Sequence, residues 1–214
     1  PAGDAIRVLQ LAQQHRGLSA AMLSGNQAMG ATRQAKQSEV DAAMVRLQKS
    51  TPELGDAKLS AQTQQAAAEW QALAQAVADK SLPASQSFAR HTALIAGVLG
   101  LLEDISNASG IVLHPEAAGY FLQKAMLSDL PRLTEVLGQI RARGTVMLTR
   151  TTATPEERSA LAALTLASRT HLADARKALD LSVSANGELG RQLSGQIGAV
   201  VMSGNPVIGL VIFL

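Results

Sequence analysis

The stretch from Asp4 to Met29, DAIRVLQLAQQHRGLSAAMLSGNQAM, indicates the fold class of this protein. Its apolar residues recur at spacings of three and four, which places them on neighbouring stripes of one long α-helix. Such a helix is apolar over more than half of its circumference and belongs inside a bundle, with Ser24–Asn26 as a kink or short break. The first stripe comprises Ile6, Leu9, Gln13, Arg16, Ala20 and Leu23, and the second comprises Val8, Leu11, His15, Leu18 and Met22.

Further helical segments follow, separated by residues that favour turns. Thr154 is a good helix start, because a threonine cap is followed by proline and two acidic residues. Ser85 is expected to cap the fourth helix, and Pro131 is expected to kink or restart the fifth. The predicted helices cover about residues 4–29, 32–49, 59–79, 86–107, 115–148, 155–184 and 188–201.

The composition supports the same fold class. Strong helix formers dominate, and aromatic residues make up only 2% of the 214 residues, too few for a β-sandwich or barrel. We therefore predict an all-α fold of elongated antiparallel helical bundles, because the first four segments already suffice for one bundle with short loops. Because residues 107–115 resemble a loop, the first bundle is assigned to residues 1–110 and the second to 111–202. Residues 203–214 form an apolar tail, which is the truncated start of a membrane helix, a buried tail or a junction artefact.

Several classes of function are disfavoured by what the chain contains. The formal charge of +2 and the scarcity of aromatic residues provide no surface for nucleic acid. There is no cysteine, which excludes disulfides and thiolate metal sites, and none of the four histidines stands three or four residues from another. No glycine-rich phosphate loop is present either. We therefore expect no enzymatic activity, no cofactor, no metal and no nucleic-acid partner.

Two Arg-Gly pairs are the candidate functional residues. Arg16 precedes Gly17 on the apolar stripe of the first helix, and Arg143 precedes Gly144 in a similar setting, two residues after Arg141. An arginine on an apolar stripe is costly to bury unless it is paired, and its planar fork suits an oxyanion. The pattern leaves two interpretations open. Either the arginines hold an anion that the glycines allow to approach, or they pair with carboxylates or solvent while the glycines serve helix crossings.

The segment Gln14-His15-Arg16-Gly17-Leu18-Ser19-Ala20 resembles the opening of the nitrate- and nitrite-sensing (NIT) domains of bacterial receptors. His114-Pro115 followed by Tyr120-Phe121-Leu122 is similar to a downstream Asp-Pro and Tyr-Tyr-Leu pattern of these domains, with His114 and Phe121 as departures. The segment Gly138–Gly144 resembles the helix that follows. The resemblance covers roughly residues 5–170.

This resemblance implies an all-helical sensor built from two stacked bundles of the four-helix type, which holds nitrate or nitrite between helices of the two bundles. Arg16, Gly17 and Gln13 would contact the anion from the first bundle, and Arg143, Gly144 and Arg141 from the second. It also implies a transmembrane signalling receptor of the chemotaxis or sensor-kinase type, in which a helix shift reaches an output domain. A homodimer attached to the membrane by flanking segments is expected, with the sensor in the periplasm, although a cytoplasmic location stays open.

A helical interaction or lipid-associating protein without a small ligand is the alternative function, because the chain is Ala-rich and its end is apolar. The aromatic residues Trp70 and Tyr120 are expected to be core residues, with the Tyr120 hydroxyl bonded to a carbonyl.

Overall fold

The computed structural model describes residues 1–110, 116–150, 153–188, 191–192 and 195, with the backbone alone at 145–146 and 148–150. Helices dominate this described part, and it contains no strand, which confirms the predicted all-α class. The chain divides into two compact units, Pro1–Ser109 and Gly110–Leu214. The predicted helix 188–201 and the tail 203–214 lie largely or wholly outside the described residues, as do His114 and Pro115.

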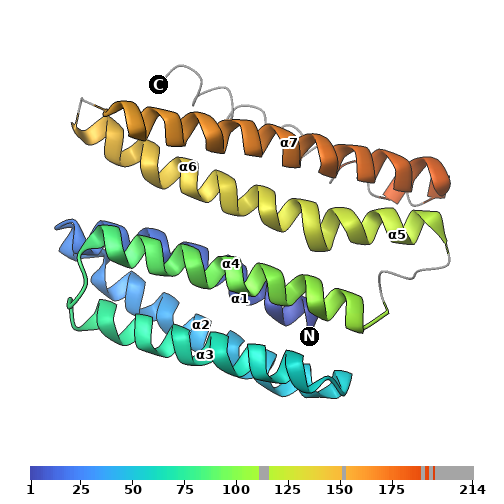
Figure 1. Cartoon of the computed structure of the whole chain (residues 1–214), viewed down its shortest axis with the longest axis horizontal. Coiled ribbons are helices and arrows are strands. Elements are labelled where there is room, and N and C mark those ends of the chain that lie inside the picture. The colour runs from blue at the N-terminus through green and yellow to red at the C-terminus, as the bar shows by residue number, and fades with distance from the viewer. Residues whose placement is uncertain (111–115, 151–152, 189–190, 193–194, 196–214) are drawn as a thin grey trace. The chain divides into compact units, whose positions relative to one another are not determined.

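Unit 1 is a four-helix bundle in which consecutive helices are joined by short connections (Figure 1). α1 packs against α2 and α4, and α3 also packs against α2 and α4, so the helices close into a ring around one core. A short 3₁₀ turn, η1, precedes α2, and another, η2, follows it. The bounds are α1 Ala2–Leu23, η1 Gln27–Met29, α2 Gly30–Ser50, η2 Thr51–Leu54, α3 Ala57–Ala78 and α4 Ala84–Ala108.

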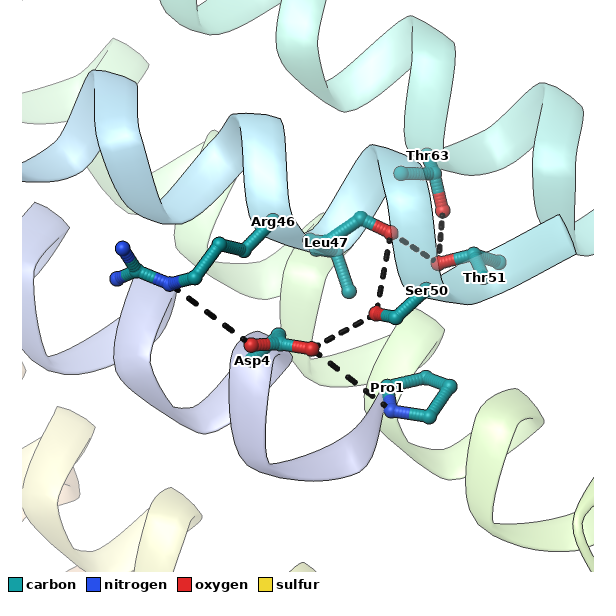
Figure 2. A network of polar contacts seen from close by, with 7 residues as sticks. All are labelled: Pro1, Asp4, Arg46, Leu47, Ser50, Thr51 and Thr63. Atoms are coloured by element: carbon teal, nitrogen blue, oxygen red, sulfur yellow. Dashed lines mark hydrogen bonds and ion pairs between the residues drawn. The ribbon is translucent and has the colours of Figure 1, made fainter. Parts of the chain in front are cut away.

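The ends of the helices in unit 1 are tied together by polar contacts (Figure 2). Near the start of α1, Asp4 accepts a hydrogen bond of 2.7 Å from the Ser50 hydroxyl at the end of α2. One residue further, the buried Thr51 hydroxyl accepts a bond of 3.2 Å from Thr63 on α3. The start of α3 is capped by Asp56, whose carboxylate accepts from two backbone amides. These contacts set the register of three helices at one end of the bundle.

The described part of unit 2 is a helical hairpin. One arm runs through α5 (Ala117–Lys124), the π-helical turn η4 (Ala125–Asp129) and α6 (Leu130–Arg150). The other arm is α7 (Pro155–Ala185), which packs against α5, η4 and α6. The predicted start of α7 is confirmed, because Thr154 and Glu157 form a reciprocal capping box. Pro131 stands in the first turn of α6, directly after the π-helical turn, so the helix restarts there.

Three local predictions are wrong. The first helix ends at Leu23 rather than Met29, and the break that was predicted at Ser24–Asn26 is confirmed, because Gly25 there adopts a φ of +110°. Ser85 does not cap α4, since the helix begins at Ala84, two residues earlier than predicted, with Pro83 at the cap position and no side-chain cap. Tyr120 is 41% exposed rather than buried, and its ring packs edge-on against Phe121 with the centroids 5.2 Å apart.

Within the part of the chain that the structure describes, no helix is long and apolar enough to cross a membrane.

Candidate functional site

One residue from each helix of unit 1 meets in the middle of the bundle. His15 comes from α1, Arg33 from α2, Trp70 from α3 and His91 from α4, and we call these four residues the central cluster. His15 Nδ1 lies 2.8 Å from His91 Nε2, and the Trp70 ring stands edge-on to the His15 ring at 4.9 Å. All four residues are buried, and Trp70 is a core residue as predicted. The interior of the bundle is therefore polar at its centre.

The partners of the two imidazoles determine which nitrogens carry protons. His91 Nδ1 lies 2.7 Å from the Ser87 carbonyl oxygen, which only accepts, so His91 donates there and its Nε2 is left to accept. The proton between the rings consequently sits on His15 Nδ1, which donates to His91 Nε2. His15 Nε2 in turn accepts from the Arg33 Nη1 group at 3.3 Å. Hydrogen bonds thus run in one direction from α2 through α1 to α4.

Both histidines are neutral in the folded protein. Burial, the neighbouring His91 and the Arg33 charge lower the pKa of His15 to about 3. Burial also lowers the pKa of His91 to about 4, against the opposing effect of its bond to the Ser87 carbonyl. The central cluster therefore holds one formal positive charge near neutral pH, that of Arg33.

Arg33 is only 6% exposed, and its guanidinium is engaged on one side alone. Nη1 donates to the Gln37 side-chain oxygen at 2.7 Å as well as to His15, whereas Nε is buried without a hydrogen-bond partner. Within the described part of the chain, Arg33 forms no ion pair. Burial without a counter-charge lowers the pKa of Arg33 below its ordinary value.

Arg16, the first predicted ligand residue, is 2% exposed on α1. Its Nη1 donates to the Thr92 hydroxyl at 3.0 Å, and its Cζ lies 5.0 Å from the centroid of the Phe88 ring on α4. Thr92 donates onward to the Phe88 carbonyl at 2.9 Å, which orients its oxygen toward Arg16. α4 therefore provides a polar and an aromatic face for this guanidinium, directly beside the central cluster.

The other predicted residues of α1 are less buried than Arg16. Gly17 and Gln13 are partly exposed. A Cβ added at Gly17 would meet no atom within 4 Å, so this glycine does not serve a tight helix crossing in the described structure. Space therefore exists beside Arg16 at the position where the sequence analysis placed an approaching ligand or backbone.

The second Arg-Gly pair lies on α6 of unit 2. Arg141 and Arg143 are exposed, whereas Gly144 is buried, and a Cβ added there would also meet no atom within 4 Å. The six predicted site residues thus fall into two groups, one in each unit. Arg16, Gly17 and Gln13 belong to unit 1, and Arg141, Arg143 and Gly144 belong to unit 2.

The sequence analysis missed Arg33 and His91, although spacing could have found both. Arg33, Gln37, Val40, Met44 and Leu47 alternate at four and three, the pattern of the buried face of α2. Ser87, His91, Leu94, Val98, Leu101 and Ile105 do the same on α4. Polar residues that continue an apolar stripe are the signal for a polar core. No set of three or more metal-ligating side chains gathers among the described residues.

Comparison with known proteins places this arrangement in context. A family model described as nitrate and nitrite sensing matches residues 7–195. A search of curated proteins returned no match. Among solved structures, the NasR transcription antiterminator is similar, with 19% identity and a TM-score of 0.68. The alignment covers 99% of this chain and 65% of that chain, so the chain spans about two thirds of the antiterminator's length. At this identity the likeness concerns the fold.

The family match extends over most of the chain, from the Arg16 helix through the Arg143 helix, and the chain therefore belongs to the nitrate- and nitrite-sensing NIT family.

Proposed function

We propose that this chain binds nitrate or nitrite directly and passes the binding event to an output domain as a helix shift. The observation that carries the proposal is the family match over residues 7–195, which includes both Arg-Gly pairs. The proposed anion-binding residues are Arg16, Gly17 and Gln13 of unit 1 and Arg143, Arg141 and Gly144 of unit 2.

The chemistry of Arg16 supports its part in this proposal. A guanidinium presents parallel N–H groups that match a planar oxyanion, which a lysine ammonium does not. Arg16 is buried against an aromatic ring and a hydroxyl of α4, so an anion bound there would interact in a partly desolvated setting. The open space at Gly17 gives an anion room beside the guanidinium.

The same contacts indicate how binding would become a signal. Arg16 joins α1 to α4 through Thr92 and Phe88. An anion that competes for the Arg16 donors would loosen this join, and packed helices respond by moving to a second arrangement rather than by deforming gradually. A ligand shifts such an equilibrium only as far as it prefers one arrangement. We propose that the anion prefers the helix arrangement in which the Arg16–Thr92 hydrogen bond is broken.

The wider setting is a second part of the proposal. We infer a sensor that works as a homodimer within a transmembrane receptor of the chemotaxis or sensor-kinase type, with the NIT domain in the periplasm. The family occurs in such receptors, as the resemblance of the Arg16 segment implies. Fractionation of cells that express the full gene product tests this directly. Recovery in carbonate-washed membranes is expected, and recovery in the soluble fraction would contradict the receptor setting while leaving anion sensing intact.

Titration calorimetry of the purified chain tests the anion proposal. Nitrate and nitrite should release saturable heat, whereas chloride and sulfate, which are not planar, should bind at least about tenfold more weakly. Arg16→Lys and Arg143→Lys keep the charge but lose the fork, and each should weaken nitrate binding. Arg7→Gln is the matched control, because Arg7 lies on the same helix and its contact with Glu39 is exposed.

The outcomes separate the candidates. Nitrate binding that survives in Arg16→Lys and Arg143→Lys would remove these arginines from the site. No heat with any anion would reject the sensor proposal and leave the alternative, a helical interaction or lipid-associating protein without a small ligand.

A further inference from the structure

Arg33 has an unused hydrogen-bonding edge in the interior of unit 1. Its Nη1 group is taken by His15 and Gln37, but its Nε is buried without a partner, and no hydrogen bond joins its Nη2 to a described residue. Nε and Nη2 form the edge of a guanidinium that binds a carboxylate or another planar oxyanion through two parallel bonds. The part of Arg33 that stays free is thus the part best suited to such a ligand.

The charge of Arg33 is also uncompensated. Its two hydrogen-bond partners are the neutral His15 imidazole and the Gln37 amide, and it forms no ion pair within the described residues. Burying a cation without a counter-charge costs several kcal/mol in general. His15 provides no counter-charge, because burial, His91 and the Arg33 charge hold its pKa at about 3 and the imidazole is neutral near neutral pH. An anion is the species that would remove the penalty.

Arg33 lies near one end of the bundle. Arg33 stands in the first turn of α2, directly after the exposed segment 24–28 and the 3₁₀ turn η1. Its long side chain reaches from that end of the bundle to His15 on α1. The N-terminus of α2 has no side-chain cap, so the positive end of the helix adds to the local attraction for an anion.

The geometry points to Arg33 as an additional anion-binding residue that takes one planar oxyanion through its Nε and Nη2 edge while His15 and Gln37 hold its Nη1 group. This inference deepens the proposed function and rests on it for the choice of nitrate and nitrite. A small carboxylate has the same planar, bidentate chemistry, and the test below includes it. Arg33 differs from the two Arg-Gly pairs because it belongs to no sequence motif and lies on α2.

The test uses the whole chain with calorimetric titrations of nitrate, nitrite, formate and chloride. Arg33→Gln removes the charge, and Arg33→Lys keeps the charge but removes the fork. Both should bind nitrate at least about tenfold more weakly than the unaltered chain. Arg46→Gln is the matched control, because Arg46 lies on α2 but is exposed and forms an ion pair with the half-buried Asp4 at 4.0 Å (Figure 2). It should bind nitrate within about twofold of the unaltered chain.

The unaltered chain supplies a second measurement that does not depend on the variants folding. The ¹⁵Nε–¹H signal of Arg33, assigned through bonds to its own side chain, should shift and saturate with nitrate but not with chloride. No shift at saturating nitrate, nitrite or formate would overturn the inference. If the unaltered chain binds nitrate, unchanged nitrate affinity in both Arg33 variants would also overturn it.

The failure of this inference is distinguishable from that of the proposed function. If Arg16→Lys loses nitrate binding while both Arg33 variants keep it, the sensor stands and Arg33 has no part in it. If the chain binds formate through Arg33 but neither nitrate nor nitrite, the Arg33 site stands and nitrate sensing falls. If no planar anion binds the unaltered chain, both are rejected.

Discussion

His15 and His91 are hydrogen-bonded to each other at 2.8 Å, although 76 positions separate them in the sequence. The bond joins α1 to α4 inside the first unit, and its direction follows from the Ser87 carbonyl, which requires a proton on His91 Nδ1. The arrangement needs each ring to be neutral. A second proton on His91 Nε2 would face the His15 Nδ1–H group, and a second proton on His15 Nε2 would face the Arg33 Nη1 donor. The pair therefore makes the stability of the bundle depend on pH.

Stability should rise as the pH increases from 4.5 to 6.5. The unfolded chain binds protons at its histidines with the ordinary pKa near 6.5, while the folded chain keeps the pKa of His15 at about 3 and that of His91 at about 4. Because the unfolded state then holds more protons, each histidine raises the free energy of unfolding by up to about 1.4 kcal/mol per pH unit. Above pH 6.5 this contribution is constant. Urea unfolding at a series of pH values measures the slope.

A double variant provides the control for the pH dependence. In the double variant with His15→Gln and His91→Gln, the slope of the free energy of unfolding against pH between 4.5 and 6.5 should fall by the amount that the two histidines contribute. Replacing His171 of α7 by Gln should leave the contribution of this pair in place. An unchanged slope in the double variant would show that other groups cause the pH dependence.

The two histidines should also be coupled energetically. His15→Leu leaves the His91 Nε2 lone pair buried without its donor, and His91→Leu leaves the His15 N–H without its acceptor. Each single change should cost about 1–3 kcal/mol from the orphaned group in addition to any change in packing. The double variant should cost less than the sum of the singles, because it removes both partners. A double-mutant cycle from urea unfolding measures the difference, and strict additivity would show that the bond adds nothing.

Trp70 should be the most costly single truncation near the central cluster. Its ring is 1% exposed, stands edge-on to His15, and donates from Nε1 to the Asp41 carboxylate at 2.6 Å. Trp70→Ala should lower the free energy of unfolding by about 3–5 kcal/mol. Leu166→Ala on α7 is the contrast, because Leu166 is 67% exposed and should change stability by at most about 0.5 kcal/mol. Similar losses in the two variants would contradict the burial of Trp70.

Gly17→Ala should separate stability from ligand binding. Alanine is preferred over glycine inside a helix by about 1 kcal/mol, and a Cβ at position 17 meets no atom within 4 Å. The variant should therefore melt at a higher temperature than the unaltered chain without ligand. If an anion approaches Arg16 at this point, nitrate should raise the melting temperature of the variant less than that of the unaltered chain. A nitrate effect equal to that of the unaltered chain would exclude Gly17 from the approach path.

Local patterns in the sequence predicted the helices and several of their ends. Apolar residues at spacings of three and four determine which face of each helix is buried, and the Thr154–Glu157 box depends only on residues within one turn. The wrongly predicted helix ends also have local causes. Pro83 displaced Ser85 as the cap position of α4, and the positive φ of Gly25 ended α1 early. Tyr120 lies exposed beside Phe121. The sequence did not predict this exposure, because a short amphipathic segment does not reveal which aromatic ring its partner helix covers.

The pattern of apolar residues alone also placed Arg16 on a buried stripe, and Arg16 is buried there. What it could not determine is which residues of the other helices meet it. Arg33, Trp70 and His91 reach His15 only because α1, α2, α3 and α4 close into a ring, which brings together side chains from four distant segments. Helix formation is governed by neighbours three and four residues away, whereas the partners of a buried charge are chosen by the packing of whole helices. The helical fold therefore follows from the sequence pattern, and the polar centre of the bundle follows from tertiary packing.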